Sequence, residues 1–366
     1  MTTGGEDELA RARALVLAHG WNSTAYQILN PGIAHWFSSG SDAVAGYVDC
    51  GAVWTIAGAP VAPEPRFAAV VAELESAAAA AGATVCYLGA EARLENLCRA
   101  RPGYAFVLLG AQPCWEPSSW TAIQNRRASL RGQLARARNK GVTVERWPPE
   151  RAGHHPDLAR CLEQWLATKG LPPLGFMTTP FTLARLDDRQ IIVAQREGSV
   201  VGFLVASPVP GRRGWLVEQI VRGTGAPNGT AELLLDAAMR EMIAGRAEYV
   251  TLGLAPLSRR AGEGGPINPW WLRWSMAWLR AHGRRFYNFD GLDAFKAKFD
   301  PEWWDPVYAI TNTPRFTPRT LYAVGQAFSD NAPIAMMLSA MGRAVREEIR
   351  RLIRSPGRGN QVPAGR

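Results

Sequence analysis

Residues 286–304 (FYNFDGLDAFKAKFDPEWW) combine seven aromatic residues, four acids and two lysines in nineteen positions. Asp290 is placed to cap the start of a helix, and Asp293 follows near its positive end. An apolar stripe shares one face of that helix: Leu292, Phe295 and Phe299. Lys296 lies at the edge of the stripe and Lys298 well round the helix. Two interpretations stay open. The lysines extend over an aromatic core, or Lys296 offers positive charge to a phosphate or a developing oxyanion.

A second stretch that could bind an anion, residues 117–144, contains no acid. As one helix it has an apolar face formed by Ile123, Leu130, Leu134 and Ala137. Arg127, Arg131 and Arg138 fall in a narrow arc beside that face, where guanidinium groups suit phosphate contacts, as to tRNA. The alternative is a solvated basic surface with no ligand.

The junction VRGTGAPNGTAEL, residues 221–233, tests for acetyl-coenzyme A. Acyltransferases of the acetyltransferase-like (GNAT) fold hold the coenzyme A pyrophosphate on backbone N–H groups at such a junction. Arg222 and Gly225 fit their pattern, but Pro227 has no N–H to donate. The loop therefore argues against coenzyme A as donor.

The composition limits the possible partners and the cellular location of the protein. The 366 residues carry a formal net charge of +9, which favours a polyanionic partner such as nucleic acid or an anionic membrane, although an arginine-rich surface alone explains it equally well. No stretch reaches the ~20 apolar residues of a membrane span, and the N-terminus lacks a signal-peptide pattern. We expect a cytoplasmic protein. The five scattered cysteines predict buried thiols, and no metal site or cofactor is predicted.

The elements that position these residues form two similar blocks. In the first, residues 43–61 predict a strand hairpin, 64–83 a helix, and 84–90 and 104–113 two buried strands. In the second, 189–208 predict a hairpin, 214–221 a strand, 229–245 a helix and 248–255 a strand. Hairpin, strand, helix, strand is the core order of the GNAT fold. We predict an α/β (α+β) protein of two tandem GNAT folds.

The expected domains are residues 1–150 and the catalytic 151–330, followed by 331–366 as a basic amphipathic helix and disordered tail. That helix carries an apolar stripe: Met337, Met341, Val345, Ile349 and Leu352. Its arginines could lie against a bilayer, or the stripe could dock on the protein itself. A tryptophan stripe, Trp271, Trp274 and Trp278, predicts core, with an apolar wall or a base-stacking platform as the alternative.

Three motifs in order, VRGTGAPNG, LGLAPLS and FYNFDGLDAFKAKFDPEWWDPVY, resemble the catalytic domain of the aminoacyl-phosphatidylglycerol synthases, the phosphatidylglycerol lysyltransferase family. The resemblance implies two tandem GNAT folds and transfer of an aminoacyl group from aminoacyl-tRNA to a lipid hydroxyl. It is looser over the first block, where Gly58-Ala59-Pro60 replaces the usual Gly-Asp-Pro. Gln219 stands where the family has aspartate. The membrane-spanning part of many members has no counterpart here.

The resemblance assigns the site by motif. It implies catalytic roles for Arg222, Ser258, Lys296 and Lys298. It implies substrate contacts for Glu218, Gln219, Asn228, Tyr287, Asn288 and Asp290. In a regular strand, Glu218 and Gln219 would point to opposite faces. Because Gln219 replaces an acid, the transferred amino acid stays open, and Glu218 or Asp290 is a candidate partner for its α-ammonium.

Three functions remain in competition. The first is a tRNA-dependent aminoacyltransferase whose acceptor is phosphatidylglycerol or a small soluble hydroxyl compound, located in the cytoplasm or at the inner face of the cell membrane. The second is a coenzyme A-dependent N-acyltransferase. The third is a module that binds RNA or membrane without catalysis. Pro227 favours the first over the second.

Overall fold

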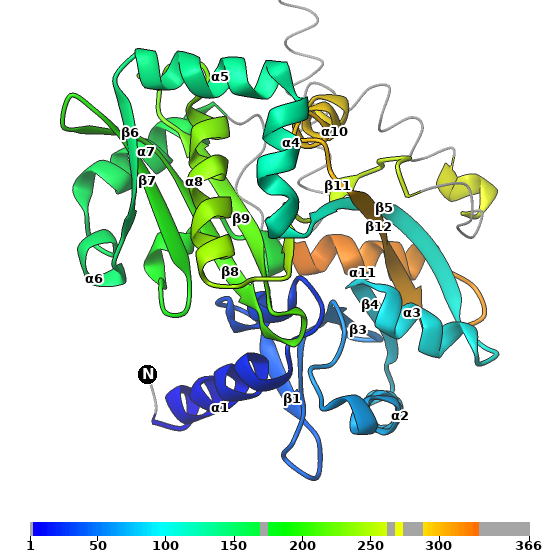
Figure 1. The fold of residues 1–366 in the computed structure, drawn as a ribbon. Helices are drawn as coiled ribbons and strands as arrows, with labels where there is room; N and C mark the ends of the chain where they lie inside the picture. The colour runs from blue at the N-terminus through cyan, green and yellow to red at the C-terminus, as the bar shows by residue number, and fades with distance from the viewer. Residues whose placement is uncertain (1–2, 169–174, 262–267, 274–287, 329–366) are drawn as a thin grey trace, which may run out of the picture.

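The computed structural model describes residues 3–168, 175–261, 268–273 and 288–328. Its strands form one mixed sheet in the order β1-β2-β3-β4-β12-β5-β10-β9-β8-β7-β6, with β11 paired to β5 (Figure 1). The first half of the chain supplies β1 (Ala34–Phe37), β2 (Val44–Asp49), β3 (Val53–Ala57), β4 (Thr84–Ala90) and β5 (Ala105–Trp115). The second half supplies β6 (Val142–Trp147), β7 (Gln190–Arg196), β8 (Ser199–Val209), β9 (Gly214–Arg222), β10 (Tyr249–Thr251), β11 (Ala255–Pro256) and β12 (Trp303–Thr311).

The two halves repeat one plan. In the first, β1, β2 and β3 are antiparallel neighbours, helix α2 (Phe67–Ala80) follows, and β4 returns parallel to β3. In the second, β7, β8 and β9 are antiparallel, helix α8 (Thr230–Ala244) follows, and β10 returns parallel to β9. The predicted tandem GNAT architecture is confirmed. The β7–β8 turn is the tight type that suits a twisted hairpin, since Glu197 and Gly198 both have positive φ.

The halves exchange their last strands. β5 pairs with β10 of the second half, β12 pairs with β4 of the first half, and β5 and β12 pair with each other. β6, from before residue 150, pairs with β7 at the far edge. Hydrogen bonding is therefore continuous across the sheet. The predicted domain limits stay predictions, and residues 331–366 lie outside the described part of the chain.

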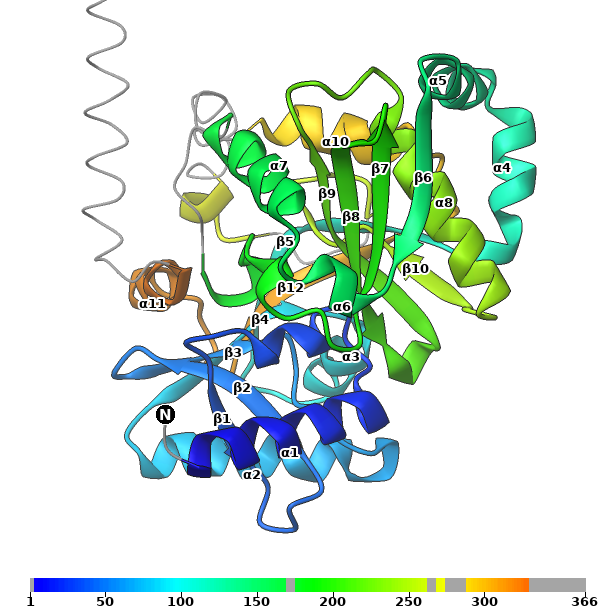
Figure 2. The same ribbon diagram turned by 90° about the vertical axis from the view of Figure 1, so that its left-hand side faces the viewer.

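Helices cover both faces of the sheet (Figure 2). On the first half, α1 (Thr3–His19) and α11 (Pro318–Phe328) pack into one buried cluster, and α2 and α3 (Ala92–Arg99) into another. On the second half, α4 (Trp120–Arg126), α5 (Ala128–Asn139) and α8 share a cluster. The opposite face carries α6 (Pro149–Ala152) and α7 (Pro156–Ala167). The predicted burial of thiols holds for four of the five cysteines, Cys50 being half-buried.

The predicted single basic helix is wrong in one respect. It breaks into α4 and α5 at Arg127, whose φ of −102° and ψ of 87° are not helical. The predicted apolar face is nevertheless buried as a set: Ile123, Leu130, Leu134 and Ala137. Apolar residues of α4 and α5 pack in one cluster with α8. The apolar face was therefore predicted correctly, although the spacing of its residues does not reveal the break in the helix.

Candidate active site

Lys296 lies on helix α10 (Phe289–Ala297) and is almost fully buried. Its Nζ donates to the carbonyl oxygens of Leu252, Gly253 and Leu254 at 2.7, 2.7 and 2.8 Å. Burial lowers the pKa of Lys296 to about 7. The three acceptors favour the ammonium form, because only that form has three N–H groups. The amine thus holds the turn between β10 and β11 and does not point into an open cavity.

Ser258 follows β11 and ends the segment LGLAPLS, residues 252–258, that begins with this turn; it is also buried. Its Oγ donates to Asp293 Oδ1 at 2.6 Å, while Arg260 Nε donates to the other oxygen, Oδ2, at 2.8 Å. Leu257, immediately before Ser258, has a φ of 60°, a conformation that costs energy for a branched side chain. Asp293, three residues before Lys296 on α10, therefore holds the end of the segment whose start Lys296 holds. The sequence showed this acid only as a partner for the helix dipole.

A β-bulge in β9 changes the predicted direction of two site residues. Val205 pairs with Gln219 and Ala206 with Val217, so Glu218 is the extra residue. The side chains of Glu218 and Gln219 consequently both contact the segment 180–189, and the predicted opposite orientation is wrong. Glu218 forms a buried double hydrogen bond with Arg189. The Gln219 amide binds Thr182 Oγ1 at 2.8 Å and the Pro180 carbonyl at 3.1 Å.

Two predicted residues flank or lie in the loop between β9 and α8: Arg222 is the last residue of β9 and Asn228 lies in the loop, and both are exposed. Neither side chain has a hydrogen-bonding partner within the described part of the chain. Pro227 is buried, and its carbonyl accepts from the N–H and the hydroxyl of Thr230, at 3.2 and 2.7 Å. The first turn of α8 is thus closed by the loop itself.

The positive end of α8 is occupied by a carboxylate of the chain. Glu232, in the first turn, is buried and pairs with Lys298 Nζ at 2.8 Å. Lys298 therefore points toward α8, away from the turn that Lys296 holds, as the helical spacing predicts. Helix α5 closes the same end: a Cβ on Gly229 would lie 2.1 Å from the Gln133 carbonyl oxygen. An anionic pyrophosphate would meet both the acid and this backbone.

The three arginines predicted to contact tRNA all have protein partners. Arg127 pairs with Asp300, and Arg131 donates to the carbonyls of Gln124 and Asn125 at the end of α4. Arg138 Nη2 lies 2.9 Å from Asp236 Oδ2. These contacts clamp α4 and α5 to neighbouring elements. The role of these arginines in tRNA binding stays a prediction.

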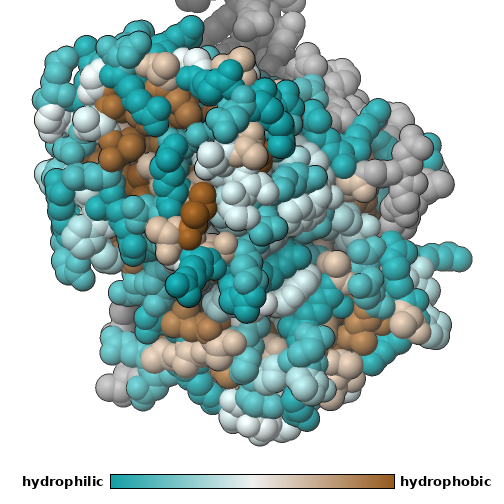
Figure 3. All heavy atoms as spheres, in the orientation of Figure 1, coloured by the Kyte–Doolittle hydropathy of each residue, from teal (hydrophilic) through white to brown (hydrophobic). Residues whose placement is uncertain are grey.

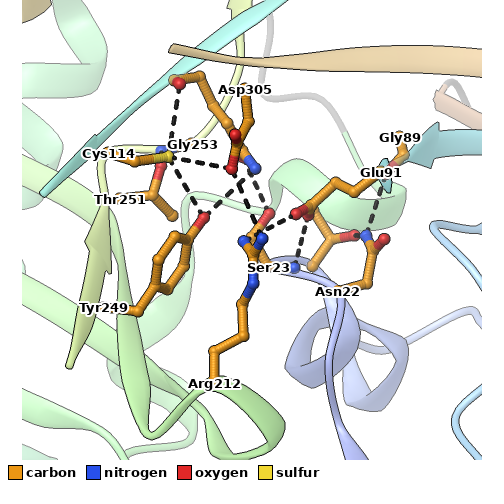
Figure 4. A network of polar contacts seen from close by, with 12 residues as sticks. Asn22, Ser23, Gly89, Glu91, Cys114, Arg212, Tyr249, Thr251, Gly253 and Asp305 are labelled. Atoms are coloured by element: carbon orange, nitrogen blue, oxygen red, sulfur yellow. Dashed lines mark hydrogen bonds and ion pairs between the residues drawn. The ribbon is translucent and has the colours of Figure 1, made fainter. Parts of the chain in front are cut away.

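A buried polar network joins the two halves where their strands cross (Figure 4). Arg212, from the β8–β9 turn, lies 3.1 Å from Glu91 and 3.5 Å from Asp305 of β12. Its guanidinium stacks between the rings of Trp21 and Tyr249. The Ser23 N–H donates to Glu91 at 2.6 Å, and burial raises the pKa of Glu91. No sequence pattern predicts this network, because its members are far apart along the chain.

The network reaches the turn that Lys296 holds. Cys114 Sγ lies 3.5 Å from both the Tyr249 hydroxyl and Asp305 Oδ2, and burial raises the pKa of this thiol. Thr251, opposite Cys114 in the sheet, accepts a hydrogen bond from the Gly253 N–H at 3.0 Å. The Gly253 carbonyl in turn accepts from Lys296. Polar contacts therefore run from the junction of the two halves to residues 252–254, the turn that Lys296 holds.

A family model described as phosphatidylglycerol lysyltransferase, C-terminal, matches residues 13–311. The chain belongs to this family. It is 28% identical over 207 residues to a phosphatidylglycerol lysyltransferase of Bacillus subtilis, an alignment covering 55% of this chain but only 23% of that protein. No described helix has the length and apolar character needed to cross a membrane.

Solved structures support the fold assignment. A C-terminal domain assigned to a lysylphosphatidylglycerol synthetase of Agrobacterium fabrum aligns with a TM-score of 0.72 at 24% identity, covering 86% of this chain and 94% of that one. L-PGS from Bacillus licheniformis aligns with a TM-score of 0.70 at 22% identity, covering 91% and 96%. At these identities the likeness concerns the fold alone.

The helix α10 starts differently from the prediction. Asn288, not Asp290, is the N-cap, and its side chain accepts from the Gly291 N–H at 2.9 Å. Asp290 lies inside the first turn, so the predicted cap is wrong by two residues. Tyr287 lies outside the described residues, as do Trp274 and Trp278. Trp271 is partly buried against the cluster under α11, as core.

Proposed function

We propose that this chain is a tRNA-dependent aminoacyltransferase that moves an aminoacyl group from aminoacyl-tRNA to a hydroxyl of phosphatidylglycerol. The observation that carries the proposal is the geometry of the LGLAPLS turn. Lys296 and the Asp293–Ser258 pair, from two motifs of the family, hold its two ends, at residues 252–254 and at Ser258. A catalytic turn must be held in position to contribute through orientation.

The reaction exchanges one ester for another. The acceptor oxygen forms a bond to the aminoacyl carbonyl carbon, the bond from that carbon to the ribose oxygen breaks, and the acceptor proton ends on the ribose hydroxyl. No activation step is needed, because the donor is already an activated ester. Positioning alone can supply ~7–11 kcal/mol of the acceleration.

The site residues divide into two groups by exposure. Arg222 and Asn228 are exposed and have no hydrogen-bonding partner among the described residues, so they contact substrate, and the guanidinium of Arg222 suits a phosphate of the donor or the lipid. Lys296 and Ser258 are buried and bonded internally, so they act as positioning residues. Glu218 is held by Arg189, so its carboxylate is not available to the α-ammonium of the substrate.

The competing coenzyme A-dependent function is disfavoured by the same structure. Pro227, the Glu232 carboxylate and the approach of α5 to Gly229 all stand where an acyltransferase of this fold would bind pyrophosphate. A soluble hydroxyl acceptor in place of the lipid is the remaining alternative.

The test compares donors and one matched pair of variants. Purified chain is incubated with phosphatidylglycerol vesicles and either labelled aminoacyl-tRNA or labelled acetyl-coenzyme A. We expect label on the lipid from aminoacyl-tRNA only, and a loss of at least tenfold in Arg222→Ala. Arg319→Ala, an exposed arginine on α11, is the control and keeps its rate. Transfer from acetyl-coenzyme A, or equal rates in both variants, would contradict the proposal.

A further inference from the structure

An open groove of about 440 Å³ lies between the edge strand β6 and helix α8, on the face that α5 borders. Its floor is apolar and is built by Val142, Val144, Ile192, Leu233 and Ala237. Figure 3 shows apolar residues ringed by hydrophilic ones over the region where β6 and α8 lie in Figure 1. The Lys296 turn and the β9–α8 loop contribute nothing to its lining.

One arginine from each of three elements lines this groove. Arg138 comes from α5, Arg146 from β6 and Arg240 from α8, and their side chains are 52%, 52% and 58% exposed. Three guanidinium groups on three walls surround the apolar floor. Each group keeps N–H donors that no described acceptor uses, because a guanidinium has five.

A buried acid fixes two of these arginines in place. Asp236 on α8 accepts from Arg138 at 2.9 Å and from Arg240 at 3.2 Å. The same carboxylate accepts from Trp120 Nε1 at 3.0 Å and from the Gln124 amide. Its oxygens are fully occupied and its side chain is 2% exposed. It therefore orients the arginines without presenting a free negative charge to the groove.

Besides Asp236 the lining holds two further acids, Glu145 and Glu241, so its three arginines are formally balanced and the excess positive charge comes from residues beside the groove. Glu241 reaches only to 3.8 Å from Arg146, which is a weak pair at the surface. Glu145 also contributes to the lining, and its carboxylate accepts from Trp147 and Arg151. Near the end of α5, Arg136 and Lys140 are exposed and have no partner in the described part of the chain. These two cations extend the basic rim beyond Arg138.

We infer that this groove binds the sugar–phosphate backbone of the RNA donor. Planar guanidinium groups on three sides match successive phosphates, and an apolar floor accommodates a ribose or a base between them. A bilayer would need a protruding face rather than a concave one. The inference rests on the proposed function for the identity of the RNA, and it places the contact surface at the groove that Arg138 lines and that Arg127 and Arg131 do not.

The test measures binding of uncharged, unfractionated tRNA to the full chain as a function of salt. The groove variant is Arg136→Gln/Arg146→Gln/Lys140→Gln, which spares the arginines held by Asp236. The control, Arg273→Gln/Arg315→Gln/Arg319→Gln, removes the same charge from exposed arginines elsewhere. We expect the slope of log affinity against log salt to fall by about 2 in the groove variant, at about 0.7–0.9 for each lost contact, and to stay unchanged in the control.

Equal slopes of log affinity against log salt in the two triple variants would contradict RNA binding in the groove, since the affinity would then depend only on the total charge of the protein. An unchanged slope in the groove variant would also overturn it. Because uncharged tRNA is the probe, binding is scored without turnover. A groove-dependent slope in a protein that transfers no aminoacyl group would support the groove and contradict the proposed function, so the two failures are distinguishable.

Discussion

Replacing Lys296 by methionine tests whether this buried amine positions the LGLAPLS turn. Methionine keeps the length and apolar stem of lysine but removes three hydrogen bonds to the carbonyls of residues 252–254. At about 1 kcal/mol net for each bond, the turn loses about 3 kcal/mol of local stability. Since 1.4 kcal/mol corresponds to a factor of ten, the turn should open on the order of 100-fold more often.

Hydrogen exchange read by mass spectrometry measures that opening directly. The Leu257 N–H, which donates to the Leu109 carbonyl at 2.7 Å, and the Ser258 N–H, which donates to the Ala255 carbonyl, are the reporters. We expect faster exchange by about two orders of magnitude in peptides covering 252–258 of Lys296→Met. Lys298→Met, which removes a contact to α8 instead, is the matched control and leaves that exchange unchanged.

The refuting result is unambiguous. If Lys296→Met abolishes aminoacyl transfer while exchange in 252–258 matches the wild type, the amine acts on substrate and the positioning argument is wrong. If Lys298→Met accelerates exchange there as much as Lys296→Met does, the effect is general destabilisation rather than loss of this hydrogen-bonded turn.

Three further predictions follow from the same contacts. Because burial lowers the folded-state pKa of Lys296 to about 7, below its unfolded value of about 10.4, the unfolded state binds more protons between these values. The free energy of unfolding of wild type, relative to Lys296→Met, should therefore rise with pH from about 7 to about 10 in urea titrations, and a flat difference would contradict the lowered pKa. Asn288→Ala should lower the free energy of unfolding by about 1 kcal/mol through loss of the α10 cap, whereas Asp290→Ala should lose no cap; the reverse ranking would return the cap to Asp290. Truncation after residue 330 should remove sedimentation with anionic vesicles at low salt, and equal sedimentation of both forms would exclude the C-terminal helix as the anchor.

Much of the fold follows from local pattern. The hairpins, α2, α8 and the buried strands lie where apolar alternation and turn residues predict them, since each depends on neighbours in sequence. The exchange of β5 and β12 could not be predicted in this way. Strand order depends on contacts between residues some 200 apart, such as Cys114 with Trp303, and no local pattern encodes them.

The site was predictable by residue identity but less so by geometry. Motifs pointed to Lys296 and Ser258, yet neither spacing nor composition reveals that their polar atoms are satisfied internally. Helical spacing placed Lys296 and Lys298 on different sides of α10, which is confirmed. The regular alternation of side chains along β9 does not hold at the bulge. The extra residue, Glu218, changes the direction of the side chains next to it. Asp293 was visible as a charge but its partner, 35 residues earlier, was not.

One assay measures whether the chain transfers an aminoacyl group from tRNA to phosphatidylglycerol. Purified chain is mixed with a complete set of aminoacyl-tRNAs and a total lipid extract, and the products are read by mass spectrometry. We expect a new phosphatidylglycerol ester that bears one or a few amino acids and is absent when the tRNA is deacylated beforehand. Aminoacyl groups that remain on tRNA throughout, or that appear only on water-soluble acceptors, would contradict transfer to phosphatidylglycerol.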